Sequence, residues 1–211
     1  MQKFWPDCSD VDQGMILYLH GFRSSPQSFK ARLLAQRMSA LGRAADYACP
    51  QLPPEPRSAI SLARDLAQRA PPSRLTLIGS SLGGYYATFL AEELGCRAVL
   101  LNPALRAYEK LANHVGPQTA YHGEGEAFEF KAEFLEQLRQ LDVGRITRPE
   151  RYFLVAATGD ELLDWREMVA GYPGARHRIV QGSDHGLTDF VDQIDEVLEF
   201  AASGAGAWPR P

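Results

Sequence analysis

The sequence predicts an α/β protein with a mainly parallel sheet and helices on both faces. Short apolar runs alternate along the chain with amphipathic stretches, which is the pattern of parallel strands joined by crossover helices. One apolar run leads directly into Gly79-Ser80-Ser81-Leu82-Gly83, and helical periodicity follows it. A strand, a sharp Gly-x-Ser-x-Gly turn and a helix together place a serine hydroxyl at the carboxyl edge of the sheet.

One domain accounts for most of the chain. Its 211 residues, 45% of them hydrophobic, suit a single core better than two. We expect an N-terminal extension over residues 1–14, the α/β domain over 15–200 and a flexible tail over 201–211. Within the domain, residues 105–149 interrupt the alternation, and we interpret them as a helical excursion over the strand ends with no clear strand. The cap over the site is therefore expected to be small or minimal.

Six short strands and four amphipathic helices are expected. The strands are 15–19, 45–49, 75–78, 98–101, 152–157 and 177–180. Helical spacing of apolar residues marks the inward faces of the helices. These residues are Phe29, Leu33, Leu34, Met38 and Leu41; Ile60, Ala63, Leu66, Ala67 and Ala70; Tyr86, Phe89, Leu90 and Leu94; and Phe190, Val191, Ile194, Val197 and Leu198. Gly42 is expected to end the first helix.

Charge and cysteine content argue against several classes of protein. The net charge is -4 and the basic residues are scattered, which disfavours nucleic acid or an anionic membrane as a partner. Cys8, Cys49 and Cys96 form no C-x-x-C pair, so we expect reduced packing residues and neither a zinc site nor a disulfide framework. No apolar run approaches the ~18 residues of a membrane span, and no signal peptide precedes the first strand. We therefore expect a cytoplasmic protein with a small-molecule substrate, and the sequence leaves its oligomeric state open.

Two further motifs complete a candidate catalytic triad. A serine hydroxyl needs a histidine to accept its proton and a carboxylate to orient that histidine. Asp160 follows the fifth expected strand, and His185 follows the sixth in Gly182-Ser183-Asp184-His185-Gly186. The chain order Ser81, Asp160, His185 is the order of α/β-hydrolases.

Each triad assignment has an alternative. Ser81 could serve only as a helix N-cap, and Asp164 could replace Asp160 as the triad acid. His114, His122 and His177 lack a glycine-flanked loop between the last strand and the last helix, which favours His185 as the base.

The oxyanion of an acyl-transfer intermediate needs main-chain N–H donors. We expect one from Leu82, directly after the nucleophile, and one from Phe22, because Gly21 lets the chain turn after the first strand. Gly79 and Gly83 are the glycines that a tight elbow requires. The remaining candidates to line the pocket are His20, Arg23 and Tyr85, with His20 more typical of a structural hydrogen-bonding residue and Tyr85 of a packing residue.

Several of these motifs resemble the YqiA/YcfP-like small bacterial esterases of the α/β-hydrolase superfamily. They are His20-Gly21-Phe22-Arg23-Ser24-Ser25-Pro26, Gly79 to Thr88, Asn102-Pro103-Ala104, Thr158-Gly159-Asp160-Glu161 and Gly182-Ser183-Asp184-His185. The resemblance covers about residues 15–200. It implies carboxylester or thioester hydrolysis by a Ser-Asp-His triad, with no metal and no organic cofactor. The chain departs from the pattern in the residues before Met15 and at Leu105-Arg106-Ala107, where a second proline is expected.

The sequence thus predicts a serine hydrolase that cleaves acyl esters or thioesters through an acyl-serine intermediate. An acyltransferase could use the same triad, with an alcohol or a thiol in place of water. A non-catalytic hydrolase-fold binding protein is the alternative from another class, although such a protein has no physical need for all three triad members.

Overall fold

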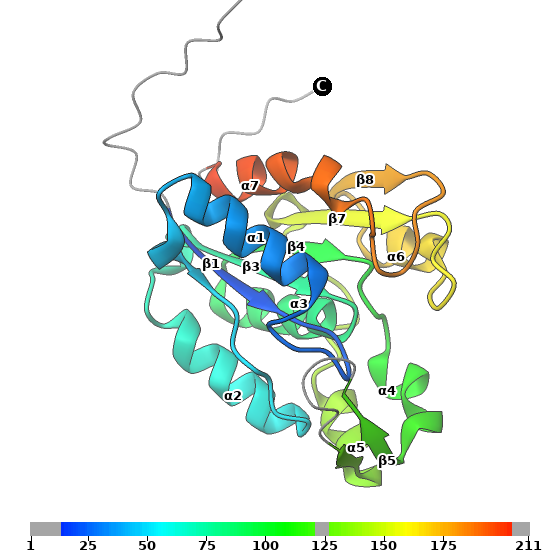
Figure 1. The fold of residues 1–211 in the computed structure, drawn as a ribbon. Helices are drawn as coiled ribbons and strands as arrows, with labels where there is room; N and C mark the ends of the chain where they lie inside the picture. The colour runs from blue at the N-terminus through cyan, green and yellow to red at the C-terminus, as the bar shows by residue number, and fades with distance from the viewer. Residues whose placement is uncertain (1–13, 121–126, 204–211) are drawn as a thin grey trace, which may run out of the picture.

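Six parallel strands form the central sheet of the protein (Figure 1). The structure is a computed structural model that describes residues 14–120 and 127–203. The strand order is β2-β1-β3-β4-β7-β8, and every neighbouring pair is parallel. Their bounds are β1 Met15–Leu19, β2 Tyr47–Ala48, β3 Leu75–Ser80, β4 Arg97–Leu101, β7 Tyr152–Ala157 and β8 Arg176–Val180. All six expected strands are therefore present, with ends within one or two residues of those expected.

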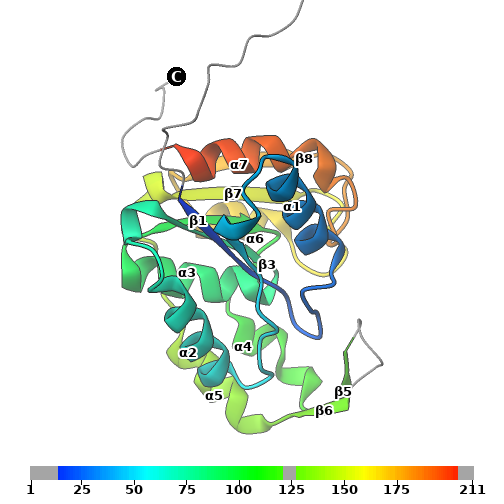
Figure 2. The same cartoon turned by 60° about the vertical axis from the view of Figure 1, so that its left-hand side comes forward.

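Helices cover both faces of this sheet (Figures 1 and 2). Helices α1 Phe29–Ala40 and α7 Ile194–Ala202 lie on one face, and α2 Pro56–Ala67, α3 Leu82–Leu94 and α6 Trp165–Gly171 lie on the other. Alternate strand residues supply the two cores, because successive side chains of a strand point to opposite faces. On β3, Leu75 and Leu77 pack with α2 and α3, whereas Ile78 packs with α1 and α7.

Three of the expected inward positions lie at the surface. Phe29 and Leu41 are 43% and 48% exposed, because Phe29 is the first residue of α1 and Leu41 is its C-cap. Val191 is 59% exposed, because Phe190–Asp192 forms a separate 3-10 turn and α7 begins only at Ile194. The spacing of apolar residues therefore located these helices correctly. It also assigned buried positions to residues at or beyond the helix ends, where the side chains lie at the surface.

The stretch expected to contain no strand holds two. Strands β5 Gly116–Thr119 and β6 Ala127–Phe130 form a separate antiparallel sheet between the short helix α4 Ala107–Lys110 and α5 Ala132–Gln140. The helical interpretation of residues 127–130 was therefore wrong. Phe128 and Phe130 both pack edge-on against the Phe22 ring, at centroid distances of 5.9 Å and 5.2 Å. Residues two apart in a strand point to the same side, which is why both rings reach Phe22. This contact packs residues 127–130 against the loop after β1.

Cys8 and His122 and most of the expected extension and tail lie outside the described residues, although Ala201 and Ala202 belong to α7. Cys49 and Cys96 are free thiols, and burial raises the pKa of each to about 12. A thiol with so high a pKa is unreactive near neutral pH, as expected of a packing residue. Within the described ranges, no helix is long and apolar enough to cross a bilayer.

Candidate active site

Ser81 occupies the sharp turn between β3 and α3. Its backbone has φ +54° and ψ -118°, a conformation that costs a non-glycine residue energy. Hydrogen bonds hold it there: the Ser81 N–H donates to the Leu101 carbonyl over 3.1 Å, and the Ala104 N–H donates to the Ser81 carbonyl over 3.0 Å. The strained turn is therefore fixed by the end of β4.

Close backbone contacts explain the elbow glycines. A Cβ on Gly79 would lie 2.2 Å from the Gly83 carbonyl oxygen, and one on Gly83 would lie 1.9 Å from the carbonyl oxygen of Leu19. Both distances are far below van der Waals contact and both neighbours are main chain. The start of α3 can therefore lie this close to β1 and β3 only with glycine at both positions.

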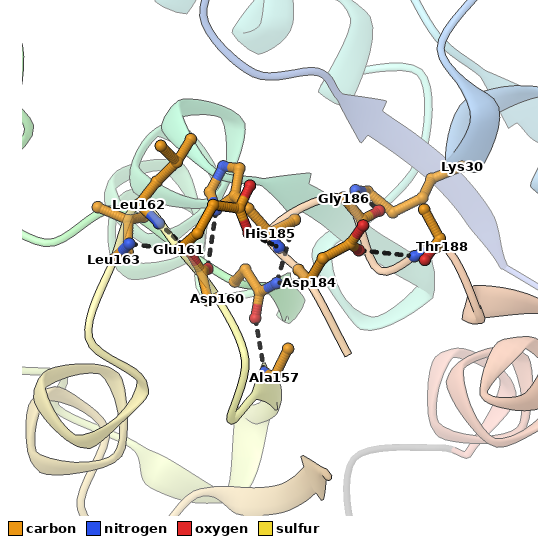
Figure 3. A network of polar contacts seen from close by, with 11 residues as sticks. Lys30, Ala157, Asp160, Glu161, Leu162, Leu163, Asp184, His185, Gly186 and Thr188 are labelled. Atoms are coloured by element: carbon orange, nitrogen blue, oxygen red, sulfur yellow. Dashed lines mark hydrogen bonds and ion pairs between the residues drawn. The ribbon is translucent and has the colours of Figure 1, made fainter. Parts of the chain in front are cut away.

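Asp160 and His185 form a hydrogen-bonded pair (Figure 3). The imidazole Nδ1 lies 2.8 Å from Oδ2 of Asp160, whose side chain is fully buried, while that of His185 is 18% exposed. The other carboxylate oxygen accepts the N–H groups of Leu162 and Leu163, over 2.9 Å and 2.8 Å. With both oxygens engaged, Asp160 holds the imidazole in one orientation.

Asp164, the alternative acid, has a different role in the structure. Its Oδ1 accepts the Arg166 N–H at the start of α6, over 2.9 Å. It is therefore a helix N-cap.

A cavity of about 520 Å³ opens beside Ser81 and contains His185 in its wall. Phe22 and Leu82 line it as well, and among the described residues no protein acceptor pairs with the main-chain N–H of either. Much of the remaining wall is apolar and is formed by Ala104, Ala107, Leu111, Leu162 and Leu163. The structure thus brings the candidate nucleophile, base and oxyanion donors to one cavity.

The other three candidate pocket residues lie elsewhere. His20 and Arg23 line a neighbouring cavity of about 330 Å³, which shares Gly21, Phe22 and Leu82 with the first but does not include Ser81. Tyr85 borders a third cavity, which Ser81 does not line, and its hydroxyl donates to the carbonyl of Leu138 over 2.8 Å.

His20 has a structural role in the loop after β1. Its Nε2 accepts the Leu52 N–H over 3.0 Å, so the proton sits on Nδ1, which donates to the Gly21 carbonyl. His20 thereby holds the loop that presents Phe22.

Two residues absent from the sequence-derived set contact the loop that carries His185. Buried Asn102, directly after β4, donates from Nδ2 to the carbonyls of Asp184 and His185, both over 3.1 Å. Lys30 on α1 donates from Nζ to the Gly186 carbonyl (Figure 3). A polar residue immediately after a buried strand is a signal that could have identified Asn102. No local signal marks Lys30, because a lysine in an amphipathic helix ordinarily faces solvent.

Comparison with known proteins agrees with this fold and these motifs. The model of the uncharacterised protein family UPF0227 matches residues 15–202. The chain belongs to this family. The match covers the motifs that carry the YqiA-like resemblance, which it confirms.

Solved structures share the fold at low sequence identity. A protein described as a hydrolase from Agrobacterium vitis S4 superposes with a TM-score of 0.70 at 18% identity, covering 92% of this chain and 89% of its own. Mouse α/β hydrolase domain-containing protein 10 gives 0.63 at 15%, covering 87% and 89%. Est1E from Butyrivibrio proteoclasticus with bound ferulic acid gives 0.60 at 13%, covering 92% and 90%. The protein has the α/β-hydrolase fold, as the motif order predicted.

Proposed function

We propose that this protein is a serine hydrolase that cleaves acyl esters or thioesters through an acyl-serine intermediate. The observation that carries the proposal is the Asp160–His185 hydrogen bond beside a cavity that the strained Ser81 shares with His185. A half-buried serine and an imidazole that line one cavity, with a buried carboxylate hydrogen-bonded to the imidazole, are the groups that nucleophilic acyl transfer needs.

In the proposed reaction, His185 accepts the Ser81 hydroxyl proton as Oγ attacks the acyl carbon. Asp160 stabilises the resulting imidazolium. The main-chain N–H groups of Phe22 and Leu82, which lack protein acceptors among the described residues, would bind the oxyanion. Collapse of the intermediate transfers the imidazolium proton to the leaving alcohol or thiol. Water then attacks the acyl-serine, with His185 again serving first as base and then as acid.

The apolar residues of the cavity wall favour an apolar acyl or alcohol group. Ala104, Ala107, Leu111, Leu162 and Leu163 supply apolar wall in the cavity that Ser81 lines. The fold neighbour Est1E binds ferulic acid, an aromatic carboxylic acid, so a feruloyl ester belongs among the substrates to test.

The decisive experiment is an assay of acyl esters and acyl thioesters of graded chain length, with wild type beside Ser81→Ala. We expect hydrolysis by wild type and nearly none by the variant, and a fluorophosphonate should label wild type alone. Equal rates for the two proteins, or equal labelling, would refute the proposal. Addition of an alcohol or thiol acceptor separates acyl transfer from hydrolysis, since a transferase forms the new ester faster than the free acid.

A further inference from the structure

Lys30 is a buried cation in the wall of the candidate active site. Its residue is 8% exposed, it lines the same cavity as Ser81 and His185, and its Nζ donates to the Gly186 carbonyl. Lysine is among the residues least often buried, because removing an ammonium from water is costly. The burial of Lys30 at this position therefore calls for a structural or functional explanation.

A contribution to folding stability does not explain the burial of Lys30. Burial lowers the pKa of Lys30 to about 8, although the nearby carboxylates of Asp184 and Asp160 oppose this shift. Because the folded-state pKa lies below the ordinary lysine value, the ionised side chain decreases the free energy of unfolding below about pH 8. This penalty is relieved as the pH rises through that value toward 10.5. A group that reduces stability beside a reactive site is typical of a functional residue.

The contacts of Lys30 indicate what it does. Gly186 directly follows His185, and the two preceding carbonyls, of Asp184 and His185, accept hydrogen bonds from Asn102. Three successive carbonyls of this loop are thus held by two side chains, Asn102 from the end of β4 and Lys30 from α1. Neither side chain belongs to the loop itself.

We propose that Lys30 is a positioning residue, whose ammonium holds the Gly186 carbonyl and thereby keeps His185 in place for proton transfer with Ser81. This inference rests on the proposed function. Lys30 acts through the loop and touches no reacting atom, so its loss should lower kcat with little change in KM. A misplacement of about 1 Å in a catalytic group can cost on the order of 100-fold in rate.

The test compares Lys30→Met with wild type and with Arg32→Met. Methionine keeps the apolar stem of Lys30 but removes the donor and the charge, and Arg32 is an exposed cation on the same helix. We expect Lys30→Met to lose about 10- to 100-fold in kcat, with KM within about twofold and a melting temperature no more than about 3 °C below wild type. Lys30→Arg should recover part of kcat, and Arg32→Met should match wild type.

A pH profile provides a second readout. The carboxylates of Asp184 and Asp160 act on the charge of Lys30. The other titratable groups that line the same cavity are His185, Tyr18, Lys110 and His114. Wild-type kcat should fall as the pH rises through about 8 and Lys30 loses its charge. This alkaline decline should be absent from Lys30→Met.

Either of two results would overturn the role of Lys30. One is an unchanged kcat in Lys30→Met; the other is an alkaline decline shared by both proteins. A variant that melts far below wild type but shows full kcat at a temperature where it is folded would assign Lys30 a purely structural role. If Lys30→Met does not fold, the pH profiles of wild type and Lys30→Arg are compared instead. Arginine keeps its charge at alkaline pH, so an alkaline decline in kcat at the same pH in both proteins cannot come from residue 30. Loss of the proposed function itself would appear separately, as equal activity in wild type and Ser81→Ala.

Discussion

The side-chain amide of Asn102 donates to the main-chain carbonyl of His185 over 3.1 Å, across 83 residues of sequence. The same nitrogen donates to the Asp184 carbonyl, and Oδ1 accepts the Ala157 N–H over 2.8 Å. Asn102 therefore connects the ends of β4 and β7 to the loop of the candidate base. Its own N–H donates to the Val155 carbonyl, and its backbone has φ +43°, which asparagine tolerates better than most residues.

Replacement of Asn102 should affect stability and rate together. Asn102→Ala leaves three main-chain groups without their partner, and each buried unpaired group costs about 1–3 kcal/mol. We expect a clear fall in the free energy of unfolding, measured by urea titration, and at least about a 10-fold fall in kcat at a temperature where the variant is folded. Asn113→Ala, at an exposed asparagine, is the matched control. Wild-type kcat in folded Asn102→Ala would show that the loop keeps its place without this residue.

Asp160→Asn should lower kcat by several orders of magnitude. The amide no longer stabilises the imidazolium and can favour the wrong tautomer of His185. Asp164→Asn should keep the wild-type kcat, since Asp164 caps α6 and asparagine caps almost as well. Steady-state kinetics of the two purified variants test this, and the reverse ranking would make Asp164 the triad acid.

Adjacent serines test the register of the elbow. Ser81→Ala should abolish ester hydrolysis with a melting temperature close to wild type, because only a half-buried hydroxyl is lost. Ser80 is the last residue of β3 and is buried, so Ser80→Ala should have a much milder effect on kcat. Inactive Ser80→Ala beside active Ser81→Ala would move the nucleophile by one residue.

Gly83→Ala should prevent folding or cause a severe loss of stability. Its Cβ would overlap the Leu19 carbonyl, a main-chain atom in the central sheet that cannot move aside. Gly42→Ala is the control, because it also changes a glycine but has open space around it. There the cost comes only from the left-handed backbone at φ +72° and should be about 1 kcal/mol. Thermal unfolding of both proteins measures the contrast, and equal melting temperatures would contradict the packing argument.

The sequence by itself determined the sheet and the candidate triad. Strands and elbow are local features, set by apolar runs of the right length and by glycines that a tight turn needs, so they can be read from neighbouring residues. Asp160 and His185 were expected in the loops that follow two strands, because the carboxyl ends of parallel strands meet at one edge of the sheet. In the structure these two side chains are hydrogen-bonded to each other.

Only the tertiary structure decided which residues hold that site together. Lys30 contacts Gly186 across 156 residues of sequence, and Asn102 contacts His185 across 83. The position of Asn102 after a buried strand marks it as a candidate, but the local sequence names the partner of neither residue. The short strand containing Phe128 and Phe130 was predicted as helix because the residues around it are good helix formers. In the structure the segment is a strand, and both rings pack against the distant Phe22 ring. Tyr85 shares a helix with the elbow, yet the direction of its side chain places it at another cavity. The spacing of apolar residues predicts which face of a helix or strand is buried. Which residues that face contacts depends on how segments distant in the sequence pack together.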